Sequence, residues 1–138
     1  MSSDILNAMK ISAMGMKVQG TRLRVTSENL ANADTTALKP DGEPYRRQVI
    51  TFKNELDRKQ GLELVEVADV ADDTKTPFVD KYLPGHPAAD TNGYVKMPNV
   101  NALIEVMDVK EAQRSYEANL GMIEQARTMA QRTIDMLR

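Results

Sequence analysis

The feature that most constrains this chain is a heptad pattern near each of its ends. In the first pattern, apolar or small residues recur at alternating steps of three and four, with no proline between them. This spacing places them on one face of an α-helix, as in a coiled coil, over about 37 Å at 1.5 Å per residue. The first seam consists of Leu6, Met9, Ala13, Met16, Gly20, Leu23, Ser27 and Leu30.

A second pattern with the same spacing follows Pro98. Asn101 is a candidate N-cap, and Glu105 and Asp108 suit the first turns because acidic side chains stabilise the N-terminus of a helix. The predicted helix is about 43 Å long. The second seam consists of Val109, Ala112, Tyr116, Asn119, Ile123, Ala126, Ala130, Thr133 and Leu137.

The segment between the two seams has a different character. It holds all six prolines, and it has turn signals at Asp41-Gly42, Pro84-Gly85 and Asn92-Gly93. Runs rich in β-forming residues at 48–52 and 62–67 predict short strands, and the polar run 69–75 predicts a loop. Asn29 and Asn32, followed by a polar turn sequence, predict the end of the first helix.

These patterns predict an α+β fold in one chain of 138 residues. Long N- and C-terminal α-helices are expected, and a small, irregular β-rich region lies between them in sequence. The expected domains are residues 1–36 (first helix), 37–100 (β-rich middle) and 101–138 (second helix). The plainest alternative is that the two helices simply pack antiparallel within one domain.

Both predicted helices carry apolar residues beyond their seams. Three such residues recur every seventh position opposite the first seam, and a methionine column lies beside the second, flanked on its other side by Leu120 and Ile134. Helices that are apolar on several sides need several neighbours, so we expect other chains to supply them. Ordinary core filling for the methionines, and scattered surface residues for the others, are the alternatives. The predicted assembly interface comprises both seams without Ser27, together with Ile11, Val18, Val25, Met122, Met129 and Met136.

Several functional classes find no support. Eighteen basic against twenty acidic residues give a net charge of −2, which excludes nucleic-acid binding driven by bulk charge. Cysteine is absent, and the single histidine, His86, lies in a Pro-Gly-His-Pro turn. No phosphate-binding loop, dinucleotide fingerprint or nucleophile motif is found. We therefore expect no catalytic residues, no metal, no cofactor and no small-molecule substrate; a weak hydrolase that uses His86 is the least favoured alternative.

Targeting signals are also missing. No window approaches 18 uninterrupted apolar residues, so no membrane-spanning segment is expected. The first residues lack the basic flank and apolar run of a cleavable signal peptide.

Four strings of the sequence resemble the flagellar rod and hook protein family. They are SENLANADT at 27–35, PDGEPYRRQVITF at 40–52, YLPGHPAADTNGYVKMPNVN at 82–101 and RSYEANLGMIEQARTMAQRTIDM at 114–136. The resemblance covers nearly the whole chain and is weakest over about 54–76. Its motif residues are Asn29, Ala31, Asn32, Tyr45, Pro84, Gly85, Pro87, Gly93, Tyr94, Pro98 and Asn99.

The resemblance implies a structural subunit of the flagellar basal-body rod, which crosses the periplasm. It also implies that the terminal helices form an inner helical layer of that rod. The short length favours the proximal rod over the longer distal-rod and hook relatives. Family members are exported by the flagellar type III apparatus without a cleaved signal peptide. The implied partners are other rod proteins, copies of the chain itself, and the membrane-ring and rod adaptor proteins. Long packed helices would share load and transmit torque; the alternative is a soluble coiled-coil adaptor that dimerises through the seams.

Overall fold

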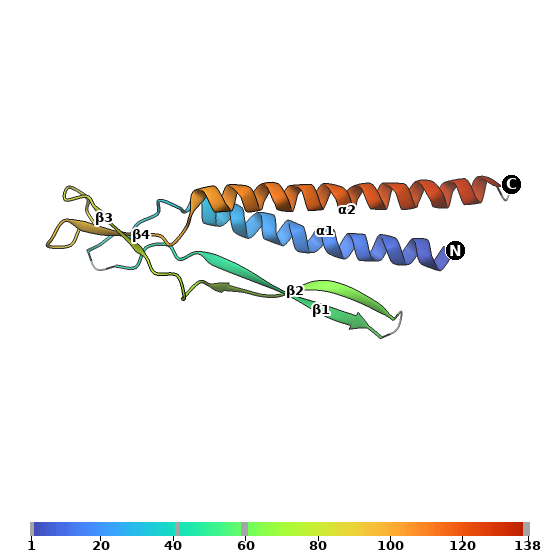
Figure 1. Cartoon of the computed structure of the whole chain (residues 1–138), viewed down its shortest axis with the longest axis horizontal. Coiled ribbons are helices and arrows are strands. Elements are labelled where there is room, and N and C mark those ends of the chain that lie inside the picture. The colour runs from blue at the N-terminus through green and yellow to red at the C-terminus, as the bar shows by residue number, and fades with distance from the viewer. Residues whose placement is uncertain (1, 41, 59–60, 137–138) are drawn as a thin grey trace. The chain divides into compact units, whose positions relative to one another are not determined.

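The computed structural model describes residues 2–40, 42–58 and 61–136. In chain order the elements are α1 (Ser2–Ala31), β1 (Gln48–Asp57), β2 (Leu62–Asp72), β3 (Val79–Tyr82), β4 (Tyr94–Met97) and α2 (Ala102–Met136) (Figure 1). The predicted α+β class, with a long helix near each end of the chain and a small β-rich region between them in sequence, is confirmed.

Polar side chains mark the helix ends as expected. The Asn101 Oδ1 accepts hydrogen bonds from two backbone N–H groups in the first turn of α2, at 3.1 and 3.3 Å. It thereby satisfies donors that a helix start leaves free. At the end of α1, the Asn32 amide donates to the carbonyl oxygen of Glu28 over 2.8 Å. Asn29, expected to help end α1, is instead fully buried in a network described below.

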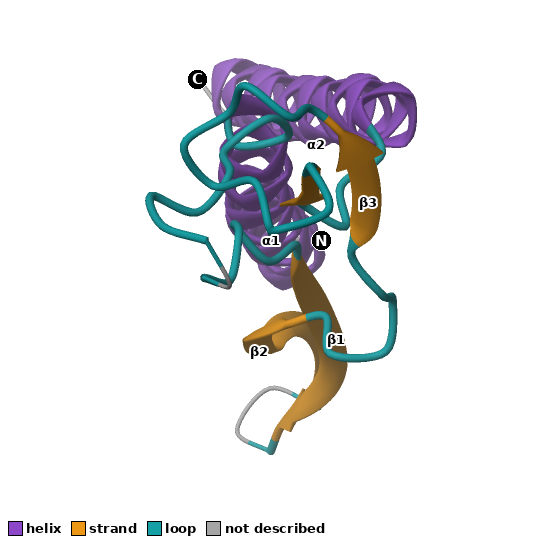
Figure 2. Ribbon diagram, turned by 90° about the vertical axis from the view of Figure 1, so that its left-hand side faces the viewer, coloured by secondary structure: helices purple, strands orange, loops and turns teal. Residues whose placement is uncertain are grey.

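The strands form two separate two-stranded sheets, β1 with β2 and β3 with β4 (Figure 2). β3 and β4 are antiparallel, from Val79 opposite Met97 to Tyr82 opposite Tyr94. β1 and β2 are longer than predicted, and the expectation of a loop over 69–75 is wrong for 69–72, which belong to β2. Polar residues are tolerated there because most of this hairpin is exposed to solvent.

The chain divides into two compact units, each of which takes a part of both helices and of the β1–β2 hairpin. The first unit contains the described residues of Met1–Leu23, Thr51–Asp69 and Lys110–Arg138. The second contains those of Arg24–Ile50 and Val70–Val109. The units therefore cut across the three zones that the sequence pattern separates.

Within the first unit, α1 and α2 meet through small and polar residues. A Cβ added at Gly15 would lie 2.9 Å from the Asn119 amide nitrogen, so the α1 backbone comes close to α2 at this point. Arg22 Nη2 lies 3.3 Å from Glu111 Oε2. Along the chain, a later position on α1 meets an earlier one on α2, so the helices are antiparallel here.

The β1–β2 hairpin contacts α1 within the same unit. Lys10 Nζ lies 2.5 Å from Asp57 Oδ2 of β1. A cavity of about 150 Å³ is lined from α1 by residues that include Lys17 and Val18, and from β2 by Glu66 and Val67. Val18 is only 3% exposed, so the hairpin side of α1 is covered by the chain itself.

Candidate assembly surface

The first seam lies on a side of α1 that the chain covers only in part. None of its residues is buried: Leu6 is 63% exposed, Ala13 and Ser27 are exposed, and the rest are half-buried. The buried residues of α1 belong to other positions, and they are Ser12, Val18, Val25, Thr26 and Asn29. The seam is therefore not the internal contact of the chain.

Two residues predicted to face other chains are instead buried within this one. Val18 and Val25 are 3% and 1% exposed, so the prediction that they await neighbouring chains is wrong. For Val18 the reason is visible in the first unit, where β2 lies against its side of α1. Ile11, the third residue of that set, remains 47% exposed. The periodicity of a helix cannot show that a distant hairpin covers one of its faces.

The internal face of α2 is narrow and made of small or polar residues. Glu105, Ala112 and Ala126 are buried, and Asn119, which falls in the same seven-residue spacing, is half-buried. Ala112 and Ala126 thus face the interior of the chain and add no free surface. The other seam residues are half-buried at Val109, Tyr116, Ile123 and Ala130 and exposed at Thr133, and Leu137 lies outside the described residues.

The large apolar side chains of α2 are exposed. The methionine column Met122, Met129 and Met136 is 57%, 50% and 81% exposed, which excludes core filling within this chain. Sequence reasoning missed a second group in the first turns, where Leu103, Ile104 and Met107 are also largely exposed. Apolar surface left in water favours association with a partner that covers it.

A buried polar network, here called the polar junction, organises the second unit. Its members are Asn29, Tyr45, Arg47, Asn99 and Glu105. Asn29 is fully buried, and its amide oxygen accepts hydrogen bonds from the backbone N–H of Gln48 at 2.8 Å and from the Tyr45 hydroxyl at 2.9 Å. Its amide nitrogen donates to the Gln48 carbonyl at 2.9 Å and to Glu105 Oε2 at 3.2 Å. One side chain of α1 thus binds Tyr45, the first residue of β1 and the first turn of α2.

The carboxylate of Glu105 is fully buried and paired. Arg47 Nε donates to Glu105 Oε1 over 2.5 Å, which compensates the burial of the carboxylate. The backbone N–H of Arg47 donates to Asn99 Oδ1 at 2.7 Å, and the Asn99 amide donates to the carbonyls of Asp73 and Thr76 at 3.0 Å each. The Glu105 partner of Arg47 lies 58 residues away along the chain, so local sequence patterns do not reveal this pair.

Two titratable groups of the second unit are shifted by their surroundings. Burial, and then the negative charges of Glu28, Asp72 and Glu105, raise the pKa of Tyr45, so the neutral phenol that donates to Asn29 is favoured. Hydrogen bonds from the hydroxyl and the backbone N–H of Thr76 lower the pKa of Asp73. The first shift favours the neutral hydroxyl that the polar junction uses, and the second favours the carboxylate that accepts the hydrogen bonds from Thr76.

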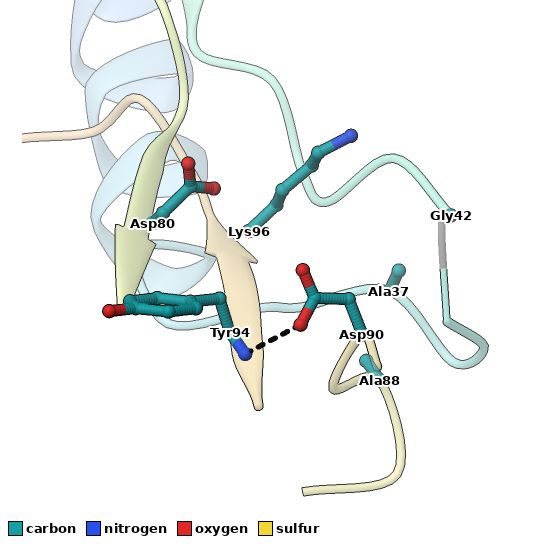
Figure 3. A pocket seen from close by; sticks show the side chains of 7 residues that line it. All are labelled: Ala37, Gly42, Asp80, Ala88, Asp90, Tyr94 and Lys96. Atoms are coloured by element: carbon teal, nitrogen blue, oxygen red, sulfur yellow. Dashed lines mark hydrogen bonds between the residues drawn. The ribbon is translucent and has the colours of Figure 1, made fainter. Parts of the chain in front are cut away.

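Other motif residues build the loop between β3 and β4. Gly93 has a φ of +85°, and a Cβ there would lie 2.9 Å from the Tyr82 ring, so this turn requires glycine. Asp90 Oδ1 accepts the backbone N–H of Tyr94 at 2.8 Å (Figure 3). Of the remaining motif residues, Pro98 is buried, Asn32 is half-buried, and Ala31, Pro84, Gly85 and Pro87 are exposed.

A cavity of about 270 Å³ lies at this loop, lined by residues that include Asp80, Asp90 and Lys96 (Figure 3). Asp80 and Lys96 are opposite one another on β3 and β4.

His86 Nδ1 accepts the backbone N–H of Ala88 at 3.1 Å, so this histidine stabilises its own turn. Among the described residues, no group of three or more histidines, cysteines or carboxylates is placed to hold a metal ion. None of the helices described here is long and apolar enough to cross a membrane.

Comparison with known proteins bears on these features directly. A family model described as "Flagellar basal body rod FlgEFG protein C-terminal" matches residues 91–136. The flagellar basal-body rod protein FlgC of Agrobacterium fabrum is 53% identical over 131 residues, which cover 95% of this chain and 94% of that protein. FlgC of Salmonella typhimurium is 38% identical over 96% of this chain and 97% of its own, and FlgC of Aquifex aeolicus is 35% identical over 96% of each. The motif strings, the paired terminal helices and these full-length matches agree, and the chain belongs to the FlgC family of flagellar basal-body rod proteins.

Proposed function

We propose that this chain is a structural subunit of the proximal rod of the flagellar basal body, and that it polymerises through its terminal helices to transmit torque across the periplasm. In this proposal α1 and α2 lie in an inner helical layer of the rod. The chain carries out no catalysis and uses no cofactor.

One observation carries the proposal: both long helices leave large apolar side chains in water, and the residues that α2 buries are small or polar. On α2, Ala112 is fully buried while Met129 and Met136 are 50% and 81% exposed. On α1, Leu6 is 63% exposed while Ser12 is buried. A rod under torsion needs many distributed contacts along its subunits, and exposed apolar surfaces along two helices of 30 and 35 residues provide them.

The proposed partners are copies of this chain, other rod proteins, and the membrane-ring and rod adaptor proteins. We propose further that the flagellar type III apparatus exports the chain without a cleaved signal peptide. The apolar core of the described residues is small, with Val18, Val25, Leu64 and Val95 as its largest members. A subunit with so little buried apolar surface unfolds at low free-energy cost, which suits passage through an export channel and ordering on assembly.

Substitution of Met129 by glutamate tests the proposal. Since Met129 is half exposed, Met129→Glu leaves the fold of the chain intact but places a charge on a surface that assembly would bury. Each variant is expressed in a flagellated species from which the chromosomal copy of this gene has been deleted. We expect the wild-type chain to enter purified basal bodies and Met129→Glu to be absent from them. Thr128→Glu, at an exposed position on a different side of α2 from the methionine column, is the control.

Two results would contradict the proposal. One is incorporation of Met129→Glu into rods at the wild-type level. The other is a wild-type chain that never enters basal bodies and sediments as a discrete, fully helical oligomer at micromolar concentration, which would favour the soluble adaptor instead.

A further inference from the structure

We infer that the uncovered face of α1 in one copy of the chain binds a stripe on α2 of a second copy, with the two helices antiparallel. This inference rests on the proposed function, because it specifies which surfaces of the rod subunit meet. It uses only residues of the first compact unit. The α1 stripe is defined as Leu6, Met9, Ala13, Met16, Gly20 and Leu23, and the α2 stripe as Tyr116, Leu120, Ile123, Ala130 and Ile134.

The α1 stripe has the spacing and the open space that a second helix needs. Its members recur at steps of three and four, so they form one continuous face over about 27 Å. Leu6 and Ala13 are exposed, and a Cβ added at Gly20 would meet nothing within 4 Å. Ala13 and Gly20 are the smallest members of the stripe, so they leave room for larger side chains of a second helix.

The α2 stripe matches this face in length and complements it in size. Leu120 and Ile134 are 40% and 57% exposed, and Tyr116, Ile123 and Ala130 are half-buried. These residues also follow the three-and-four spacing, interrupted only at Arg127, whose long aliphatic stem can lie along an apolar face. Branched side chains on α2 therefore fit the shallow positions on α1.

Charges at the edges of the stripes are complementary. If Met16 and Ile123 are taken as d positions of their heptads, Lys17 and Glu124 each occupy the e position that follows. Glu117 occupies the e position one heptad before Glu124. Among the described residues, none of these three side chains forms an ion pair within the chain. Residues in e positions face each other in antiparallel coiled coils, so this orientation brings Lys17 opposite the glutamates.

A second copy is the occupant because the chain cannot bring its own stripes together. Its α1 and α2 already meet through other faces, at Gly15 and Asn119 and at Arg22 and Glu111. The two stripes are different surfaces, so the contact between copies is heterologous. Heterologous contacts that do not close into a ring extend into helical assemblies, which is the symmetry of a rod.

A pair of glycine substitutions tests the steric part. Gly20 and Gly121 both have open space around an added Cβ, but Gly20 lies in the α1 stripe and Gly121 lies outside the α2 stripe. Gly20→Trp should fill the open space at this position and reduce carbodiimide cross-links between copies about tenfold. Gly121→Trp should leave the cross-links unchanged. The sample is concentrated full-length chain, with ¹⁴N- and ¹⁵N-labelled copies mixed so that only links between copies are counted.

A charge exchange tests the identity of the partner. Lys17→Glu and Glu124→Lys should each weaken association between copies about fivefold at low salt, since each puts like charges at the edge of the contact. Mixing the two variants should restore it, because the carboxylate introduced in one copy then faces the ammonium group introduced in the other. Arg132→Glu, an exposed charge outside both stripes, is the control and should have no effect.

The outcomes separate this inference from the proposed function. If the wild-type chain enters basal bodies but mixing fails to restore association, or Gly20→Trp behaves as Gly121→Trp does, the inference is overturned while the rod function stands. If the wild-type chain never enters basal bodies, the rod function itself fails. Recovery on mixing, together with the loss caused by Gly20→Trp alone, supports the inference.

Discussion

The amide of Asn29 in α1 donates a hydrogen bond to the buried carboxylate of Glu105 in α2, with 3.2 Å between Nδ2 and Oε2. Both side chains are fully buried, and they come from segments separated by 76 residues. This contact joins the end of the first helix to the start of the second within the second unit. A rod subunit whose helices bury little apolar surface is thus held at this point by polar contacts that only one arrangement of the chain satisfies.

Removal of the Asn29 side chain should strongly destabilise the second unit. Asn29→Ala leaves the Gln48 backbone and the Tyr45 hydroxyl without their partner, and a buried polar group without a partner costs about 1–3 kcal/mol. We expect the free energy of unfolding, measured in urea, to fall by about 3 kcal/mol. Asn92→Ala, in an exposed turn, should change it by less than about 0.5 kcal/mol. Equal effects of the two variants would contradict the role of Asn29.

The Arg47–Glu105 pair should show strong coupling. Arg47→Met leaves a fully buried carboxylate without its cation, and breaking a buried pair in this way costs about 3–5 kcal/mol. Replacing both residues, as Arg47→Met with Glu105→Leu, should cost clearly less than the sum of the two single changes. A double-mutant cycle measured by denaturant unfolding checks this. Additive single effects would mean that the two charges do not compensate each other.

Alanine at two glycines of α1 should have opposite effects. Gly20→Ala adds a methyl group in open space and removes the entropic cost of glycine in a helix, so it should raise the stability by about 0.5–1 kcal/mol. Gly15→Ala meets the Asn119 amide, which is itself hydrogen-bonded to the Ser115 carbonyl at 3.0 Å, so it should lower the stability. Thermal unfolding of both variants provides the measurement. Combining Gly15→Ala with Asn119→Ala should recover the loss; failure to recover would place the conflict elsewhere.

Alkaline pH should weaken the second unit through Tyr45. Because the folded state raises the pKa of this phenol, the protonated form is favoured on folding, and its contribution is fully present below the ordinary tyrosine pKa of about 10. That contribution is lost as the pH rises through the higher value of the folded state. The melting temperature should therefore fall more steeply above pH 10 in the wild-type chain than in Tyr45→Phe. Parallel curves for the two proteins would contradict the assignment.

Much of this structure could be predicted from local patterns. The two helices follow from three-and-four spacing without proline, and the cap at Asn101 follows from an asparagine placed before an apolar run. The hairpin strands are longer than the sequence predicts, because the polar run that begins at Asp69 resembles a loop in sequence. In the structure they stay in an exposed ribbon, where Lys53 and Glu66 lie 3.9 Å apart on paired strands.

The amino-acid sequence by itself determined the α+β class, the helix positions and the membership of the rod family, since all three depend on periodicity and on local strings. Only the tertiary structure decided which helix faces stay uncovered. Val18 and Val25 are buried within the chain, whereas Leu6 and Met136 remain in water. Only the tertiary structure showed that Asn29, Arg47 and Glu105 meet. The physical reason is that periodicity states which residues share a face, while the neighbour that covers a face comes from chain segments tens of residues away.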